Sequence, residues 1–146
     1  MQHDNDPSAS VGQLLGRLTR RWKANLDERL KFTGLTQARW HAMIALSKAG
    51  EPITQRELAE RISVEPSTLV RHLDALAAQG LVERIPEPGD RRANLVRLTE
   101  SAGPLIGQMT EIADALRHEL VEGVPHADIV TCVRVLSTMA DRLERA

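Results

Sequence analysis

Apolar residues recur every three or four positions over long stretches near both ends of the chain. Between residues 11 and 30 they are Val11, Leu15, Leu18, Trp22, Leu26 and Leu30. Similar stripes run from Ala102 to about Glu122 and from Pro125 to Leu143. This period of about 3.6 residues predicts three long amphipathic helices. Thr99 is a suitable N-cap for the second of them.

Shorter helices are predicted in the middle of the chain. Thr36 suits the N-cap of the first. Thr54 and Glu57 have the spacing of a capping box, in which each side chain bonds a backbone amide of the other residue. Pro66 suits the first turn of the next helix, and Gly80 suits its left-handed end. Two helices joined by a turn of a few residues predict a helix-turn-helix.

The pattern changes to alternation after Gly80. The segments LVERI and ANLVRL alternate apolar and polar residues, as half-buried strands do, and residues 86–92 between them are typical of a hairpin tip. The predicted fold class is therefore mainly α with a small β-hairpin wing, a winged helix-turn-helix with long N- and C-terminal helices. We expect a single domain over residues 1–146, with the winged lobe at 36–98 and the terminal helices at 10–33 and 99–145.

The terminal helices have no sheet to pack against, so their apolar stripes would stay partly exposed on a single chain. We therefore expect the helices at 10–33 and 99–145 to interlock with those of a second copy as dimerisation helices of a homodimer. The two helix-turn-helix units would then lie about one turn of DNA, ~34 Å, apart. The alternative is that these helices fold back onto the core of their own chain.

Composition by itself does not indicate a nucleic acid partner. The net charge is −1 and the isoelectric point about 6.5, whereas a strongly basic domain would indicate a polyanion. Residues 10–33 are locally basic, with six basic and two acidic side chains, net +4. The first ten residues do not resemble a secretory signal, and no apolar run approaches the ~18 residues of a membrane span. We expect a cytoplasmic protein with no membrane partner.

The second helix of the predicted helix-turn-helix presents a small polar face. Helical geometry points its leucines inward and turns four residues outward, namely Ser67, Thr68, Arg71 and Ala75. Arg71 can bond guanine N7 and O6 in a major groove, the two hydroxyls can reach bases or phosphates, and the helix N-terminus attracts phosphate. The alternative is a solvated helix face with an incidental arginine.

The predicted hairpin tip carries an aspartate followed by two arginines. Strand alternation places Arg91 and Arg92 on opposite sides, so one can pair with Asp90 while the other reaches into a narrow minor groove, whose negative potential attracts arginine. The alternative is a surface ion pair of little energetic consequence. Residues 66–98 carry five basic and four acidic side chains, so the hypothesis rests on the placement of the arginines and not on a net charge of +1.

The wing segment GDRRANLVRLTESA resembles the wing motif of the MarR family, in which Asp, a variable residue, Arg and a small residue follow one another. The resemblance extends from about Leu14 to Leu143. The segments LTQARW, PSTLVRHLDALAAQGLVER and DRRANLVRLTESAGPLI are especially similar to the SlyA-like branch of that family.

This resemblance implies a transcriptional regulator that binds pseudopalindromic double-stranded DNA as a homodimer. It implies that Ser67, Thr68 and Arg71 enter the major groove on the helix that Pro66 begins. Gln55 and Arg56 would contact phosphate. Either Arg91 or Arg92 would enter the minor groove beside Asp90, and Arg92 occupies the more regular arginine position of the family.

Many members of the family bind small phenolic or aromatic carboxylates between the dimerisation helices and the DNA-binding lobe. The resemblance implies such an effector here, and the candidate lining residues are Arg17, Arg21, Trp22, Thr36 and Trp40. An arginine could pair with the carboxylate while the indoles stack on the aromatic ring. The alternative is that the tryptophans belong to the core.

Catalytic and metal-binding patterns are missing from the sequence. His118, Glu119 and Glu122 come nearest to a zinc-protease helix, but Glu122 stands where a second histidine is needed. The single cysteine, Cys132, allows no intramolecular disulfide, and we expect it to act as a small apolar residue, not as an oxidant sensor. We expect no enzyme activity, no cofactor and no metal. A winged helix that only assembles proteins stays the alternative to a DNA-binding one.

Overall fold

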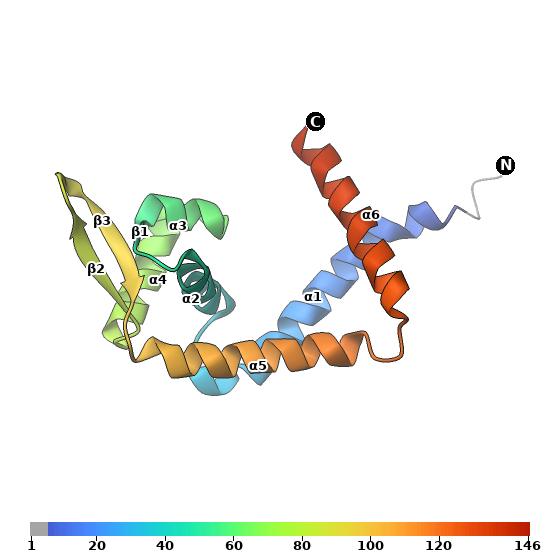
Figure 1. Ribbon diagram of the computed structural model, residues 1–146, viewed down its shortest axis with the longest axis horizontal. Coiled ribbons are helices and arrows are strands. Elements are labelled where there is room, and N and C mark those ends of the chain that lie inside the picture. The colour runs from blue at the N-terminus through green and yellow to red at the C-terminus, as the bar shows by residue number, and fades with distance from the viewer. Residues whose placement is uncertain (1–5) are drawn as a thin grey trace. The chain divides into compact units, whose positions relative to one another are not determined.

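The computed structural model describes residues 6–146, apart from the side chains of residues 91–93. The elements (Figure 1) are η1 (Pro7–Ser10), α1 (Val11–Arg29), η2 (Lys31–Thr33), α2 (Gln37–Ala49), β1 (Ile53–Thr54), α3 (Gln55–Arg61), α4 (Pro66–Ala78), β2 (Val82–Glu87), β3 (Asp90–Leu98), α5 (Ala102–Leu120) and α6 (His126–Glu144). The chain divides into two compact units, one ending at Ile112 and the other covering Ala113–Ala146.

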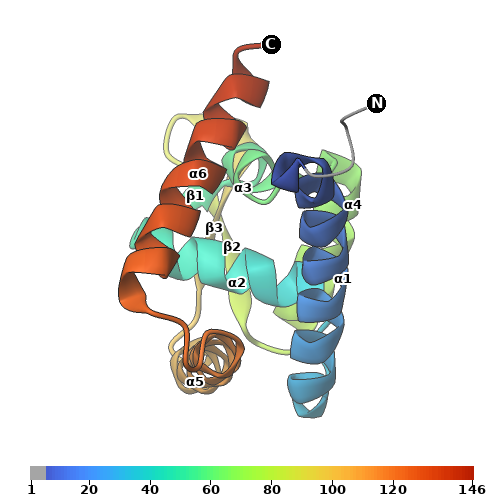
Figure 2. The same cartoon turned by 90° about the vertical axis from the view of Figure 1, so that its right-hand side faces the viewer.

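The mainly helical fold with a small wing is confirmed. Helices α3 and α4 form the helix-turn-helix, and the antiparallel hairpin β2–β3 follows them directly (Figures 1 and 2). The sequence did not predict β1. This two-residue strand pairs antiparallel with β3, with Ile53 opposite Val96, so the sheet has the order β1-β3-β2. A strand of two residues is too short to show any alternation of its own.

The structure corrects several local details. The Thr54 hydroxyl accepts a hydrogen bond from the Glu57 amide at 3.1 Å, as predicted, but the Glu57 carboxylate accepts one from Arg61 at 2.8 Å. The predicted tip at 86–92 is shorter, because β2 and β3 continue until Glu87 faces Asp90. In addition, α5 begins at Ala102 and not at the expected cap Thr99, whose hydroxyl bonds the backbone that follows α4.

The core of the first unit lies between the helices of the winged lobe and its sheet. Met43 of α2, Leu58 of α3 and Val96 of β3 are fully buried, together with three leucines of α4. These contacts fix one whole face of α4 against the lobe. The opposite face of the same helix is consequently held in a defined orientation toward solvent.

The second unit contains the end of α5 and the whole of α6. None of the residues of α6 is buried, and its exposed apolar side chains include Val130, Val133 and Leu136. Cys132, expected as a small apolar residue, is also exposed. No helix within the described residues is both long and apolar enough to cross a membrane.

Candidate nucleic-acid interface

Helix α4 has one fully buried face and one exposed face. Leu69, Leu73 and Leu76 are each 0% exposed, as their helical spacing predicts. Ser67, Thr68 and Arg71 are exposed, which confirms their predicted outward orientation. Ala75, which was also predicted to face outward, is half-buried and not fully exposed.

The exposed residues at the start of α4 have unused hydrogen-bonding groups. Within the described part of the chain, the side chains of Ser67, Thr68 and Arg71 form no hydrogen bond or ion pair. Pro66 is exposed and is the first residue of the helix, and the first intrahelical amide bond in this turn comes from Leu69. The amides of Ser67 and Thr68 therefore stay available at the positive end of the helix.

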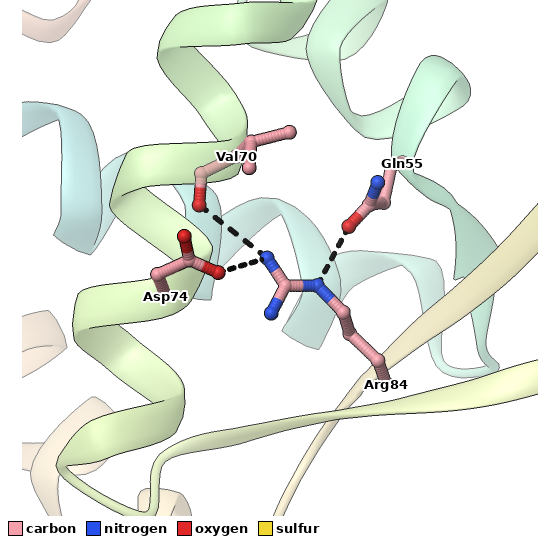
Figure 3. A network of polar contacts seen from close by, with 4 residues as sticks. All are labelled: Gln55, Val70, Asp74 and Arg84. Carbon is pink, nitrogen blue, oxygen red and sulfur yellow. Dashed lines mark hydrogen bonds and ion pairs between the residues drawn. The ribbon is translucent and has the colours of Figure 1, made fainter.

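One arginine connects three elements of this surface (Figure 3). Arg84 of β2 donates from Nε to Gln55 Oε1 at 2.7 Å and from Nη2 to Asp74 Oδ1, also at 2.7 Å. The same Nη2 lies 3.3 Å from the carbonyl oxygen of Val70. Arg84 is 25% exposed, whereas Asp74 is 62% exposed. The guanidinium thus joins the wing to the first residue of α3 and to the middle of α4.

Arg84 was missed by the interpretation of the sequence, although one signal was present. Strand alternation in LVERI places Arg84 on the same side of β2 as the buried Val82. A charged side chain on the inner side of a strand requires partners, because burial of an unpaired charge is costly. The identity of the partners could not be inferred, since Gln55 and Asp74 lie 29 and 10 residues away.

The predicted phosphate contacts lie in the first turn of α3. Gln55 is half-buried, and its carbonyl oxygen accepts from Arg84. Arg56 is 88% exposed and lies 3.5 Å from Glu60, one turn later in the same helix. Such an exposed ion pair is weak, so Arg56 can exchange Glu60 for another anion at little cost in free energy.

The wing is described only in part. Asp90 is exposed and begins β3, opposite Glu87. The side chains of Arg91 and Arg92, one of which is predicted to enter the minor groove, lie outside the described residues. At the base of the wing, Arg97 donates from Nε to Glu83 at 2.5 Å across the two strands.

The predicted effector-binding residues occupy α1 and the start of α2. Arg17 and Arg21 are exposed, Trp22 is half-buried and Thr36 is exposed at the N-cap of α2. Trp40 is 9% exposed, and its ring centroid lies 4.3 Å from that of His41. This burial fits the alternative in which Trp40 belongs to the core. The indole Nε1 of Trp40 has no hydrogen-bond partner in the described part of the chain.

A cavity of about 400 Å³ lies between α2 and the turn after α3. It is lined by His41, Ile44, Ala45, Lys48, Arg61, Ile62 and Ser63. None of the five predicted effector-binding residues is among them. Burial lowers the pKa of His41, the positive charge of Lys23 adds to this effect, and Asp27 opposes it.

A second histidine lies on α4 itself. Burial lowers the pKa of His72 below its usual value, and the positive charges of Arg39 and Arg71 add to this effect. Its Nδ1 is buried and has no hydrogen-bond partner in the part of the chain that the structure describes. The positive charge on this part of α4 therefore comes from Arg71, because a lowered pKa leaves His72 neutral at pH 7.

Comparison with known proteins agrees with this geometry. A profile of the MarR family matches residues 33–93. A crystal structure of transcriptional regulator PA3341 is 40% identical, with a TM-score of 0.83 over 93% of this chain and 99% of that one. A mutant MarR from E. coli, solved in complex with operator DNA, is 28% identical, with a TM-score of 0.78 over 88% of this chain and 92% of that one.

A third similar structure contains a small molecule. CouR from Rhodococcus jostii RHA1, bound to p-coumaroyl-CoA, is 25% identical, with a TM-score of 0.78 over 94% of this chain and 96% of that one. The similarity to these proteins spans the winged lobe and nearly the whole chain. Given the family match and the 40% identical regulator, the chain belongs to the MarR family of transcriptional regulators.

Proposed function

We propose that this chain regulates transcription by binding pseudopalindromic operator DNA as a homodimer. The observation that carries the proposal is the exposed start of α4, where Ser67, Thr68 and Arg71 have no internal partners among the described residues and the opposite face is fully buried. A rigidly seated helix with unused donors at its N-terminus suits entry into a major groove. The similar MarR of E. coli was solved with operator DNA, which supports the same role.

Each exposed group has a role that follows from its chemistry. Arg71 donates two hydrogen bonds to guanine N7 and O6, and the hydroxyls of Ser67 and Thr68 bond bases or phosphates. Arg56 and the amide of Gln55 contact phosphate at the start of α3. One of Arg91 and Arg92 enters the minor groove while Asp90 positions the other.

The dimer contributes directly to affinity in this proposal. Residues 66–98 carry a net charge of only +1, so a single lobe offers a weak electrostatic surface. The exposed apolar residues of α6 and of α1, which include Leu14 and Leu18, support a homodimer that buries them. Two copies double the number of arginines on the DNA, and the two α4 helices would lie ~34 Å apart.

The test uses duplexes selected from a random library by binding to the full-length protein. Arg71→Ala and Arg71→Lys should each weaken binding of the dimer to the selected duplex by at least about 30-fold, because a bidentate contact to guanine, which contributes about 1–3 kcal/mol, is lost from both copies. Arg61→Ala is the matched control, since Arg61 pairs with Glu57 in α3 and has no assigned role in binding. Unchanged affinity of Arg71→Ala and Arg92→Ala across a salt series would favour a winged helix that only assembles proteins.

We also propose, from the segments that resemble the SlyA-like branch, that the dimer binds a small aromatic carboxylate. Arg17, Arg21, Trp22 and Thr36 would line the site, with Trp40 packing beneath it. The similar CouR was solved with p-coumaroyl-CoA, a thioester of a phenolic acid, which supports the phenolic part of this ligand but not its free carboxylate. A panel of phenolic carboxylates that includes p-coumarate should raise the thermal unfolding midpoint, and Arg21→Ala should reduce the shift. No shift with any member of the panel contradicts this part of the proposal.

A further inference from the structure

Asp74 stands in an unexpected place for a DNA-binding helix. It follows Arg71 by three residues on α4 and is 62% exposed. Side chains three residues apart on a helix are neighbours, so Asp74 is a natural partner for Arg71. An arginine paired in this way loses donors that would otherwise bond a base, and an unpaired carboxylate nearby repels phosphate.

The contacts show that Asp74 is paired with a different arginine. Its Oδ1 lies 2.7 Å from Nη2 of Arg84, on β2, whereas Arg71 forms no ion pair in the described part of the chain. A second nitrogen of Arg84, Nε, donates to Gln55 Oε1 at 2.7 Å (Figure 3). Because the guanidinium is planar and two of its three nitrogens, Nε and Nη2, are held, its orientation toward Asp74 is fixed.

The same bond determines what Gln55 offers to a partner. Its carbonyl oxygen is occupied by Arg84 Nε, so the NH₂ group is the free end of the amide. In Figure 3 this nitrogen lies away from the guanidinium. Gln55 therefore presents donors, which suit a phosphate oxygen.

We propose that Arg84 is a positioning residue of the DNA-binding surface and not a phosphate ligand. It sequesters Asp74, which keeps Arg71 unpaired for base recognition, and it turns the donor end of Gln55 outward. This inference rests on the proposed DNA-binding function. In this proposal Arg84, on the wing, contributes to base selectivity through Arg71, although Arg84 itself does not contact the base that Arg71 recognises.

The decisive experiment combines Arg84→Ala with Asp74→Asn. Affinity is measured for a selected duplex and for an unrelated duplex of the same length, with wild type, Arg84→Ala and the double variant. Arg84→Ala should lower the ratio of the two affinities at least about tenfold, because Asp74 is released to pair with Arg71. The double variant should recover most of that ratio, since an amide cannot neutralise Arg71. A purely structural role of Arg84 predicts no recovery.

The salt dependence gives a second readout. The Arg84–Asp74 pair has no net charge, so its removal in the double variant should leave the salt slope of binding unchanged. If Arg84 contacted phosphate, the slope would fall by about 0.9 for each phosphate that is no longer neutralised, or about 1.8 in a dimer. Arg97→Ala is the matched control, because Arg97 is also a wing arginine paired with an acidic side chain, Glu83, and it should leave the ratio unchanged.

The outcomes separate this inference from the proposed function. A wild-type protein that does not distinguish the two duplexes contradicts sequence-specific binding, and the inference falls with it. A wild-type protein that distinguishes them, combined with no recovery in the double variant or a slope lowered by about 1.8, overturns the role of Arg84 alone. If Arg84→Ala does not fold, Arg84→Met, which keeps the aliphatic stem, is compared with and without Asp74→Asn.

Discussion

The hydroxyl of Thr99 donates a hydrogen bond to the carbonyl oxygen of Gly80, 2.5 Å away. Gly80 follows α4 and Thr99 follows β3, so this bond joins the end of the helix to the exit of the wing. The hydroxyl of Ser101 lies 2.8 Å from the same oxygen and 2.9 Å from the Thr99 hydroxyl. The Ser101 hydroxyl has one hydrogen: donated to Gly80, it gives that carbonyl a second hydrogen bond, and donated to Thr99, it supports the first bond indirectly.

The first prediction follows from this double support. Thr99→Val should lower the free energy of unfolding by about 0.5–1.5 kcal/mol, the usual net contribution of one hydrogen bond. Combining it with Ser101→Ala should cost more than the sum of the single changes, because the carbonyl is then left without either donor. Urea unfolding measures all three variants. Thr110→Val, at an exposed position of α5, is the control, and strict additivity of the pair would contradict the shared role.

The second prediction concerns the backbone at Gly80. Its φ is +71°, and no atom lies within 4 Å of the position of an added Cβ, so conformational strain is the only cost of a side chain. Gly80→Ala should destabilise the protein by about 1–2 kcal/mol. Gly107→Ala, in the interior of α5 and equally open, should instead stabilise it by about 0.5–1 kcal/mol through helix propensity. Changes of the same sign at the two positions would be inconsistent with this explanation.

The third prediction tests whether the buried leucine face of α4 holds this helix against the rest of the winged lobe. Leu73 is fully buried, and Leu73→Ala should cost about 2–5 kcal/mol through reduced burial and the cavity that remains. Phe32→Ala removes a larger side chain that is 63% exposed in η2, and it should cost far less. Thermal and urea unfolding measure both. Equal destabilisation would show that α4 is not held by its leucine face.

The fourth prediction is a dependence of stability on pH. The pKa values of His41 and His72 are lowered in the folded protein, mainly by burial, so the unfolded chain binds protons more readily. The contribution of these two histidines to the free energy of unfolding is therefore fully present above the unfolded pKa of about 6.5, and it is lost as the pH falls from there through their lowered pKa values in the folded protein. A His41→Gln/His72→Gln variant should lose less stability between pH 7.5 and pH 5 in urea titrations. Above pH 7.5, its difference from wild type should be constant.

The fifth prediction concerns the apolar stripe of α6. Val133 is 58% exposed on the single chain, so the proposed homodimer would bury it. Val133→Asp should shift the protein toward monomers in light scattering, because an unpaired carboxylate in an apolar interface is costly. Thr131→Asp places the same charge on the opposite side of α6 and should leave the dimer intact. A wild-type monomer at working concentrations contradicts the homodimer itself.

Local sequence determined the identity and limits of most elements. The spacing of Leu69, Leu73 and Leu76 predicted both the helix and its buried face, and Pro66 and Gly80 lie at its two ends. These features depend on residues a few positions apart, which is the range over which helical geometry and backbone preferences act. The exposure of Arg71 followed from the same spacing.

Tertiary structure decided the rest, because the remaining contacts join residues that are far apart in sequence. Alternation could show that Arg84 lies on the inner side of β2, but only the packing of β2 against α4 brings it to Asp74. Only the pairing of β1 with β3 makes Ile53 and Thr54 a strand. The helical spacing allowed Asp74 to face either Arg71 or another cation. The fold selected Arg84, because the rigid guanidinium reaches Gln55 and Asp74 at once.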